Sequence, residues 1–595
     1  MASQPHEPLR FFAELRRRKV FRAVFAYVAI AFIALQIIDL LIPATNLPSW
    51  ADALLLAIAI MGFPVCIIAA WALEQTPDGV RFTQPVGNDN SEHEPRQPMT
   101  VGLAATLGLF VAAGAVWWFL VSPSQDELAA VENTIAVMPF ETLGADKANA
   151  FTEGVHLGVL TRLSNVSELE VISRTSVRAI DTKDKTLPEI AEALGASWIL
   201  RAEVQVSGTN VQINARLIDA RQDRQVWAQN YQRELTVDNI FDIQSELALA
   251  IIEALHKNLT PLERARVDQR PTDNLEAYGL FTSGRSELDR RDEQGMRAAV
   301  VYFEQAIALD ANYALAWTGL ADALILLYDY HIDRDDSHLI RAEEAIHRAL
   351  ELDPFSAEAF ASLGLLNHAR QNSPEAIQAL TRAVKLKPNY ADAQSWLAWG
   401  YQISGNPEAG LTSAKKAVLV NPLSGESRSN LTLSYLATGD YDQALVEALH
   451  NQDLLASWPT ALFYEGIALY HQGHFAEAQT TLKDLSVDWT DFGAESLLAL
   501  SYIATGDEQA AREILDALIL TDDFFSVALV YAALGESDLA FTTLQRIDHW
   551  NSWPALALRH FFPSVIGPLR EDARYQAIID NLDKSWGIDD RTPWQ

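Results

Sequence analysis

Three prolines recur at a spacing of 34 residues in the C-terminal half of the chain: Pro354, Pro388 and Pro422. Small residues keep the same interval, as Ala342, Ala376, Gly410, Ala444 and Ala478, and as Ala349, Ala383 and Ala417. A fixed period of this length indicates one supersecondary unit stacked on copies of itself. We interpret each unit as a pair of antiparallel helices. The alanines mark where two helices cross too closely for a larger side chain, and the proline opens the next helix.

From about Ala357 to Ala478 this pattern of small residues, aromatics and a closing proline resembles the tetratricopeptide repeat. The resemblance implies an all-α solenoid, and proteins of this kind usually bind other proteins. We expect the repeats to occupy residues 274–547 as seven or eight helical pairs. Residues 548–595 are expected to cap the solenoid.

The resemblance also implies which side chains line the binding groove. In tetratricopeptide arrays the first helix of each pair faces the concave surface. The matching positions are Asp322, His368, Trp399, Gln402, Phe463, Tyr470 and His471. Exposed Trp and Tyr are frequent binding hot spots, so we expect this groove to contact a protein partner, for which an extended peptide is one candidate. The alternative is that Trp399 only packs against a neighbouring helix.

Three apolar runs in the N-terminal region are long enough to cross a bilayer, which takes roughly 20 residues. They span residues 23–42, 53–73 and 101–121. Before the first run lies a basic segment, residues 1–22, which contains Arg16, Arg17, Arg18 and Lys19. We interpret the first run as an uncleaved anchor rather than a signal peptide, because no small-residue cleavage site follows it.

Basic residues set the expected orientation, because they stay on the cytoplasmic side. Lys and Arg are concentrated before the first run and absent from residues 43–52. We therefore expect a cytoplasmic N-terminus and, after three crossings, periplasmic C-terminal domains in a bacterial inner membrane. Residues 7–85, with the string FFAELRRRKVFRAVFAYVAIAFIALQIIDLL, also resemble a membrane module that begins many bacterial repeat proteins.

Residues 133–257 predict a mixed α/β domain of order β-α-β-α-β-β-β-α. Its clearest signal is the alternation of Leu200, Ala202, Val204 and Val206 with polar residues, followed by turn residues and a second alternating run, which predicts a hairpin. The strings TIAVMPFETLG, EVISRTSVRAI and LGASWILRAEVQVSGTNVQINARLIDARQDRQVWAQNY resemble the bacterial domain related to TolB N-terminal, CsgG and FlgO proteins. That domain also occurs outside the cytoplasm in chains whose cytoplasmic end is an adenylate cyclase or a winged-helix regulator.

Charge and motifs limit the remaining functions. The net charge of −33 argues against nucleic-acid binding, which needs clustered Lys and Arg. We find no phosphate-binding loop, metalloprotease helix or nucleophile elbow, so we expect no enzyme activity and no cofactor. We also expect no metal site. The acidic insertion of residues 329–338 and the pair His471 and His474 are the weak alternatives.

The sequence thus predicts a multidomain chain with a helical membrane region, a TolB-like α/β domain and an all-α tetratricopeptide solenoid. We expect it to act as a protein-binding scaffold for partners in the cell envelope. The alternative function is the sensor half of a transmembrane signalling system that acts through a separate cytoplasmic partner.

Overall fold

A computed structural model gives the fold of this chain. The residues described are 73–76, 79–82, 133–143, 149–182, 185–207, 210–234, 236–330, 332–454, 459–483, 485, 493–547, 550 and 552–588. The chain divides into two units, residues 1–127 and 128–595.

In the first unit, the described residues are the two antiparallel strands β1 (Leu73–Thr76) and β2 (Gly79–Phe82). Apart from Leu73, the three predicted membrane spans lie outside the described residues. Where the structure is described, it contains no helix with the length and apolar character needed to span a bilayer.

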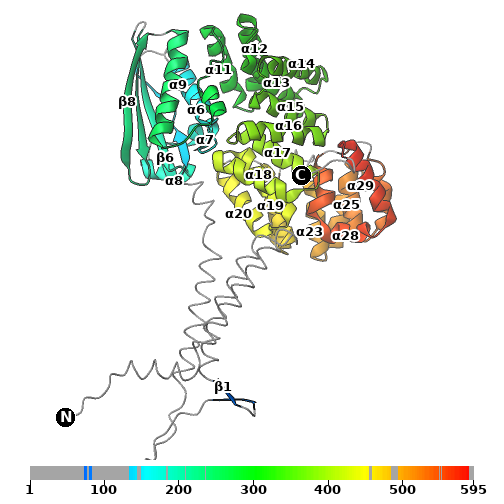
Figure 1. The fold of residues 1–595 in the computed structure, drawn as a ribbon. Coiled ribbons are helices and arrows are strands. Elements are labelled where there is room, and N and C mark those ends of the chain that lie inside the picture. The colour runs from blue at the N-terminus through cyan, green and yellow to red at the C-terminus, as the bar shows by residue number, and fades with distance from the viewer. Residues whose placement is uncertain are drawn as a thin grey trace, which may run out of the picture. The chain divides into compact units, whose positions relative to one another are not determined.

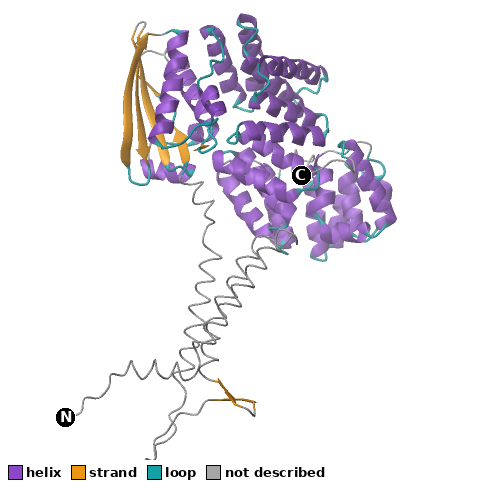
Figure 2. Ribbon diagram, viewed as in Figure 1, coloured by secondary structure: helices purple, strands orange, loops and turns teal. Residues whose placement is uncertain are grey.

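The second unit opens with a six-stranded sheet of order β5-β3-β6-β7-β8, in which β4 also pairs with β6 (Figure 2). Its strands are β3 (Thr134–Val137), β4 (Glu141–Leu143), β5 (Glu170–Val171), β6 (Trp198–Ser207), β7 (Asn210–Asp219) and β8 (Arg224–Glu234). Its helices are α6 (Asn149–Leu163), α7 (Arg174–Ala179), α8 (Leu187–Leu194) and α9 (Val237–Ala254). The predicted hairpin is present, with Trp198 opposite Asp219 and Ser207 opposite Asn210. The predicted order omitted β4 and α7, which are too short to carry a periodic pattern.

Alternation along β6 buries the sheet on both faces. Leu200, Ala202 and Val204 pack with α6 and α9, whereas Ile199 belongs to a second cluster with residues of α7 and α8. Successive strand residues point to opposite faces, so one strand supplies both cores. The helix α8 ends at Leu194, and its C-cap residue Gly195 has a φ of 61°.

Among the described residues between Leu275 and Leu544, this unit has eight antiparallel helical pairs, at the upper end of the predicted number (Figure 1). The first helices of the pairs are α11 (Leu275–Leu288), α13 (Ala314–Asp329), α15 (Ala357–Ala369), α17 (Ala391–Ile403), α19 (Gly425–Thr438), α21 (Pro459–His471), α23 (Ala494–Ala504) and α25 (Phe524–Ala533). The second helices are α12 (Glu293–Leu309), α14 (Ser337–Leu352), α16 (Ser373–Leu386), α18 (Pro407–Val420), α20 (Tyr441–Leu454), α22 (Phe475–Lys483), α24 (Glu508–Leu518) and α26 (Ser537–Leu544).

The periodic small residues lie where helices cross. Ala342, Ala376, Ala444 and Ala478 have no exposed surface. At Gly364 the approach is closer still, since a Cβ there would lie 2.4 Å from Cγ of Leu380 in the paired helix. The prolines differ from the prediction. Each stands in the turn three residues before a helix begins, rather than in the first helical turn.

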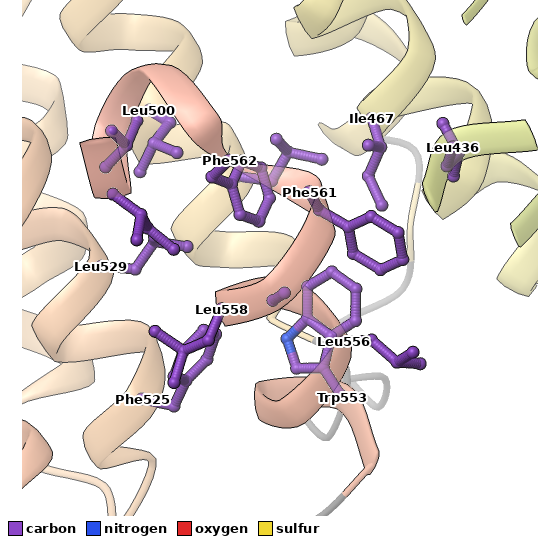
Figure 3. Packing of buried hydrophobic residues seen from close by; sticks show 14 of the residues in the cluster. Leu436, Ile467, Leu500, Phe525, Leu529, Trp553, Leu556, Leu558, Phe561 and Phe562 are labelled. Atoms are coloured by element: carbon purple, nitrogen blue, oxygen red, sulfur yellow. The ribbon is translucent and has the colours of Figure 1, made fainter. Parts of the chain in front are cut away.

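The C-terminal segment follows the last pair as α27 (Ser552–Leu556), the π-helix η3 (Ala557–Phe561), α28 (Pro563–Arg570) and α29 (Ala573–Ser585). Its aromatic residues insert between first helices that belong to different pairs (Figure 3). Figure 3 shows Phe561, Phe562 and Trp553 between Leu436 and Ile467 on one side and Leu500, Phe525 and Leu529 on the other. The segment touches the last pair, where Arg574 is 2.8 Å from Asp538. It therefore fills the inside of the later repeats as well as covering their end.

The glycine crossing gives a stability prediction. We expect Gly364→Ala to lower the free energy of unfolding of a fragment 122–595 by about 1–3 kcal/mol, because Leu380 is buried and cannot move aside. Gly279→Ala in α11 is the matched control, since nothing lies within 4 Å of its Cβ position. It should be neutral or stabilising by up to about 1 kcal/mol. Urea denaturation of both variants measures the difference, and equal stability would contradict the close-packing argument.

Candidate functional site

The inner face of the array, formed by the first helices, is the candidate functional site. In its N-terminal part the charged side chains pair with one another. Asp322 on α13 accepts a hydrogen bond from Arg285 on α11 at 3.2 Å and another from the Ser362 hydroxyl on α15. Asp322 is buried, and loss of solvent raises the pKa of its carboxyl to about 6 although Arg285 opposes the shift. This predicted groove residue therefore connects three consecutive pairs.

The α/β domain is fixed to the turns that precede first helices. Asn389 donates through Nδ2 to the backbone carbonyls of Val166 and Leu169. One repeat further on, Asn421 Oδ1 accepts from Thr175 at 2.9 Å and from Ser176 at 2.7 Å. These asparagines flank the periodic prolines, so the turns of two successive repeats hold the domain.

A second set of contacts joins the domain to α11. The Tyr278 hydroxyl donates to the carbonyl of Gly154 at 2.5 Å, and its ring lies 5.1 Å from that of Phe241. Arg174 pairs with Asp289 at 2.7 Å and with Glu153 of its own domain. These buried and half-buried contacts pack the domain against the first repeat.

In its C-terminal part the inner face is covered by the segment 552–588. Trp399 on α17 lies between the rings of His368, at 4.9 Å, and Trp586, at 6.1 Å. The backbone of Trp586 also accepts a hydrogen bond from the amide of Ser373 at 3.0 Å. The Nε2–H of His560 donates to the carbonyl of Gln402 at 2.9 Å. The segment thus reaches back to the middle of the array.

The groove residues of α21 face the same segment. Phe463 meets Trp553 at a ring distance of 4.9 Å, and Tyr470 meets Phe562 at 6.3 Å. His471 stacks on Tyr441 at 4.4 Å and lies 5.9 Å from Phe562. The burial of these rings leaves little of them for a partner to contact.

The seven predicted residues are therefore on the first helices, but the expected exposure is wrong. Asp322, His368, Gln402, Phe463 and Tyr470 are buried, and Trp399 and His471 are partly buried. The physical reason is that other parts of the same chain lie against them. The repeat pattern gives the face of each helix, and it carries no information on what a distant segment places over that face. Their role in binding a partner stays a prediction.

The weak metal candidates have other contacts. Asp333 lies 3.1 Å from His338 and 3.5 Å from Arg297, and His331 lies outside the described residues. His474 pairs with Glu477 at 3.1 Å, whereas His471 contacts the rings of Tyr441 and Phe562. Across the described ranges, no three His, Cys, Asp or Glu side chains converge as metal ligands.

Comparison with known proteins identifies the repeats. The family model of the tetratricopeptide repeat matches residues 337–391, which include α14, α15 and α16. The chain therefore contains tetratricopeptide repeats.

One curated relative, described as a putative adenylate cyclase 3 from Rhizobium meliloti (strain 1021), is 28% identical over 234 residues. That match covers 39% of this chain and 32% of the relative, so the chain spans about a third of that protein's length.

Solved structures are also similar to this chain. YrrB, a repeat protein with an unusual peptide-binding site, is 19% identical over 36% of this chain and 96% of its own, with a TM-score of 0.26. Pseudomonas aeruginosa PilF is 18% identical over 35% of this chain and 94% of its own, with a TM-score of 0.30. The Cut9–Hcn1 structure is 14% identical over 95% of both chains, with a TM-score of 0.37.

Buried histidines give this face a pH dependence. Burial lowers the pKa of His368, His471 and His560 to about 4, although each ring bonds to a backbone carbonyl. In the unfolded chain these imidazoles bind protons near pH 6.5, whereas in the folded chain they stay neutral down to about pH 4. The contribution of the neutral, buried rings to stability is therefore complete above pH 6.5 and is lost as the pH falls toward 4. The carboxyls of Asp322 and Asp329, whose pKa burial raises to about 6, act in the opposite direction.

We expect His368→Gln to reduce the loss of unfolding free energy between pH 6.5 and 4 by about 1–3 kcal/mol relative to the unsubstituted fragment. Glutamine keeps a donor for the Trp396 carbonyl, which His368 contacts at 3.0 Å. His474→Gln, at a half-exposed side chain, is the control. Urea titrations at four pH values measure the effect. An unchanged pH slope in His368→Gln would show that this imidazole is not held neutral by burial.

Proposed function

We propose that this chain is a membrane-anchored protein-binding scaffold whose α/β domain and repeats lie in the periplasm of a bacterium. The observation that carries the proposal is the array of eight described helical pairs, which hydrogen bonds through Asn389 and Asn421 join to an α/β domain. Such an array presents a long, preorganised surface, which lowers the ordering cost of binding. The TolB-like sequence strings support a role in the cell envelope.

The membrane placement rests on the sequence. Three apolar runs precede the α/β domain, and the basic residues lie before the first of them. Three membrane crossings would place residues from 122 onward on the opposite side of the membrane from the basic segment.

Topology can be tested with reporter fusions. We expect alkaline phosphatase fused after Gln125 to be active and the same enzyme fused after Asn88 to be inactive, because the reporter folds only outside the cytoplasm. A green fluorescent protein fused at the same two positions should give the inverse pattern. Activity at Asn88 together with inactivity at Gln125 would remove the periplasmic placement and leave protein binding untouched.

For partner contact we propose the inner face now covered by residues 552–588. A partner would replace the aromatic contacts that Trp586 and Phe562 make with α17 and α21. The segment then competes with a partner for the groove. The affinity for the partner depends on how much more favourable the partner's contacts with the groove are than those of the segment.

Loosening the segment tests this use of the groove. We expect Trp586→Ala to increase the amount of partner captured from the cell envelope by crosslinking and pull-down, because it removes a buried ring from the segment without changing any groove residue. Gly364→Ala is the control, since it weakens the array without changing any residue of the segment. Capture that rises equally in both variants would indicate non-specific binding, and unchanged capture would move the contact surface to the α/β domain.

The second candidate is a sensor that signals across the membrane. The observation favouring it is the match to a protein described as a putative adenylate cyclase, of which two thirds have no counterpart in the matched region. In this chain the signal would pass through the membrane region to a separate cytoplasmic protein. Crosslinking from the N-terminal basic segment that recovers a cyclase, kinase or regulator only when the periplasmic domains are intact would favour the sensor over the scaffold.

A further inference from the structure

A cavity of about 270 Å³ lies between the α/β domain and the first repeats. On the domain side it is lined by α6 and by residues 266–271, which begin in the short helix α10 (Pro261–Val267). On the repeat side it is lined by the starts of α13 and α15 and the turn before α15. Three arginines line this cavity, Arg162, Arg266 and Arg270, in a chain whose net charge is −33.

Arg162 is buried, and none of its hydrogen-bond partners is charged. It donates to the Gly158 carbonyl at 3.2 Å, to Oε1 of Gln244 at 2.8 Å and to the Gln269 carbonyl at 3.0 Å. Only 5% of the residue is exposed, and its Nε has no hydrogen-bond partner. Burial lowers the pKa of this guanidinium. Asp268 opposes that shift through its charge, but it makes no hydrogen bond to the guanidinium. A ligand that brings an anion into direct contact with this buried cation would therefore be favoured.

Arg266 adds a second unsatisfied donor. Its Nη1 donates to the carbonyl of Leu386, whereas its buried Nη2 has no partner. No carboxylate among the described residues pairs with it. Arg270, in contrast, is bound by Asp242 at 2.8 Å. Arg162 and Arg266 therefore line the cavity without a paired carboxylate among the described residues, whereas Arg270 has one.

Backbone donors point to the same place. The helix α13 begins at Ala314, and no side chain caps its first amides. Ala314 and Leu315 both line the cavity. The first amides of a helix carry partial positive charge and bind anions, and the adjoining arginines are the independent sign of a ligand here.

The two carboxylates that line the cavity have partners of their own. Asp353 accepts from the Phe355 amide at 3.0 Å, and Glu358 pairs with Lys387 at 2.8 Å. They reduce the positive charge of the cavity without supplying a counter-ion to Arg162 or Arg266. The cavity is also smaller than those that hold drug-sized molecules, which occupy about 300–1,000 Å³.

We propose that this cavity is a binding site for a small phosphate-bearing anion, held by Arg162, Arg266 and the start of α13. Phosphate oxygens suit this set because guanidinium groups and helix amides are their usual donors. The bound anion would contact the α/β domain and the repeats at the same time. The site is independent of whether the chain acts as a protein scaffold.

The test uses inorganic phosphate with the purified full chain in a non-ionic detergent, followed by ³¹P line broadening and by equilibrium dialysis against chloride of equal ionic strength. We expect saturable binding at one site per chain. Arg266→Gln should weaken it at least 10-fold. Arg264→Gln, two residues away on the same helix with a side chain that is 62% exposed, removes the same charge and should leave binding unchanged.

A second variant covers the case in which Arg266→Gln fails to fold. Ala314→Asp places a carboxylate at the uncapped helix start, where it favours the helix and competes with an added anion. We expect it to abolish phosphate binding while the thermal unfolding temperature is kept or raised. Absence of saturable binding to the unsubstituted chain, or equal binding by Arg264→Gln, Arg266→Gln and Ala314→Asp, would overturn the proposal.

Discussion

The close crossing of paired helices is the constraint on which this structure depends. At Gly364 the paired helix leaves no room for a Cβ, and at Ala342, Ala376, Ala444 and Ala478 the surface is fully buried. Tight contact within each pair sets the spacing of the repeats, and the repeats together form an inner face of first helices. That face carries aromatic and charged side chains that the second helices cannot bury. The α/β domain and the C-terminal segment bury them instead.

The inner face is completed in two chemically different ways. From the first to the fifth helical pair, polar contacts hold the α/β domain, chiefly Asn389, Asn421 and the ion pair of Arg174 with Asp289. Over the later repeats, the C-terminal segment inserts Trp553, Phe561, Phe562 and Trp586. Apolar contact is strong but weakly directional, whereas hydrogen bonds fix orientation. Hydrogen bonds therefore fix the orientation of the α/β domain, whereas the C-terminal segment fills the apolar space between the first helices.

The local parts of this architecture could be predicted from sequence, and the long-range parts could not. The 34-residue period predicts the helical pairs, and alternation along residues 198–217 predicts the hairpin, because both patterns repeat a local geometry. Short elements such as β4 and α7 give no period and were missed. The seven groove positions lie on the predicted helices, yet the rings that cover Phe463, Tyr470 and Trp399 are 90 to 187 positions further along the chain. The sequence does not indicate that Nε of Arg162 lacks a hydrogen-bond partner, because tertiary packing sets the surroundings of this atom.

Contact between Trp399 and Trp586 also changes how the repeats fold. In a simple solenoid each repeat touches only its neighbours, so folding can start anywhere and spread along the array. Here the middle of the array is completed by residues close to the end of the described chain, and a loop of nearly 190 residues must close first. Contacts of such separation slow folding and join the repeats between them into one cooperative unit. During synthesis, the contact of α17 with Trp586 therefore cannot form until every later repeat has been made.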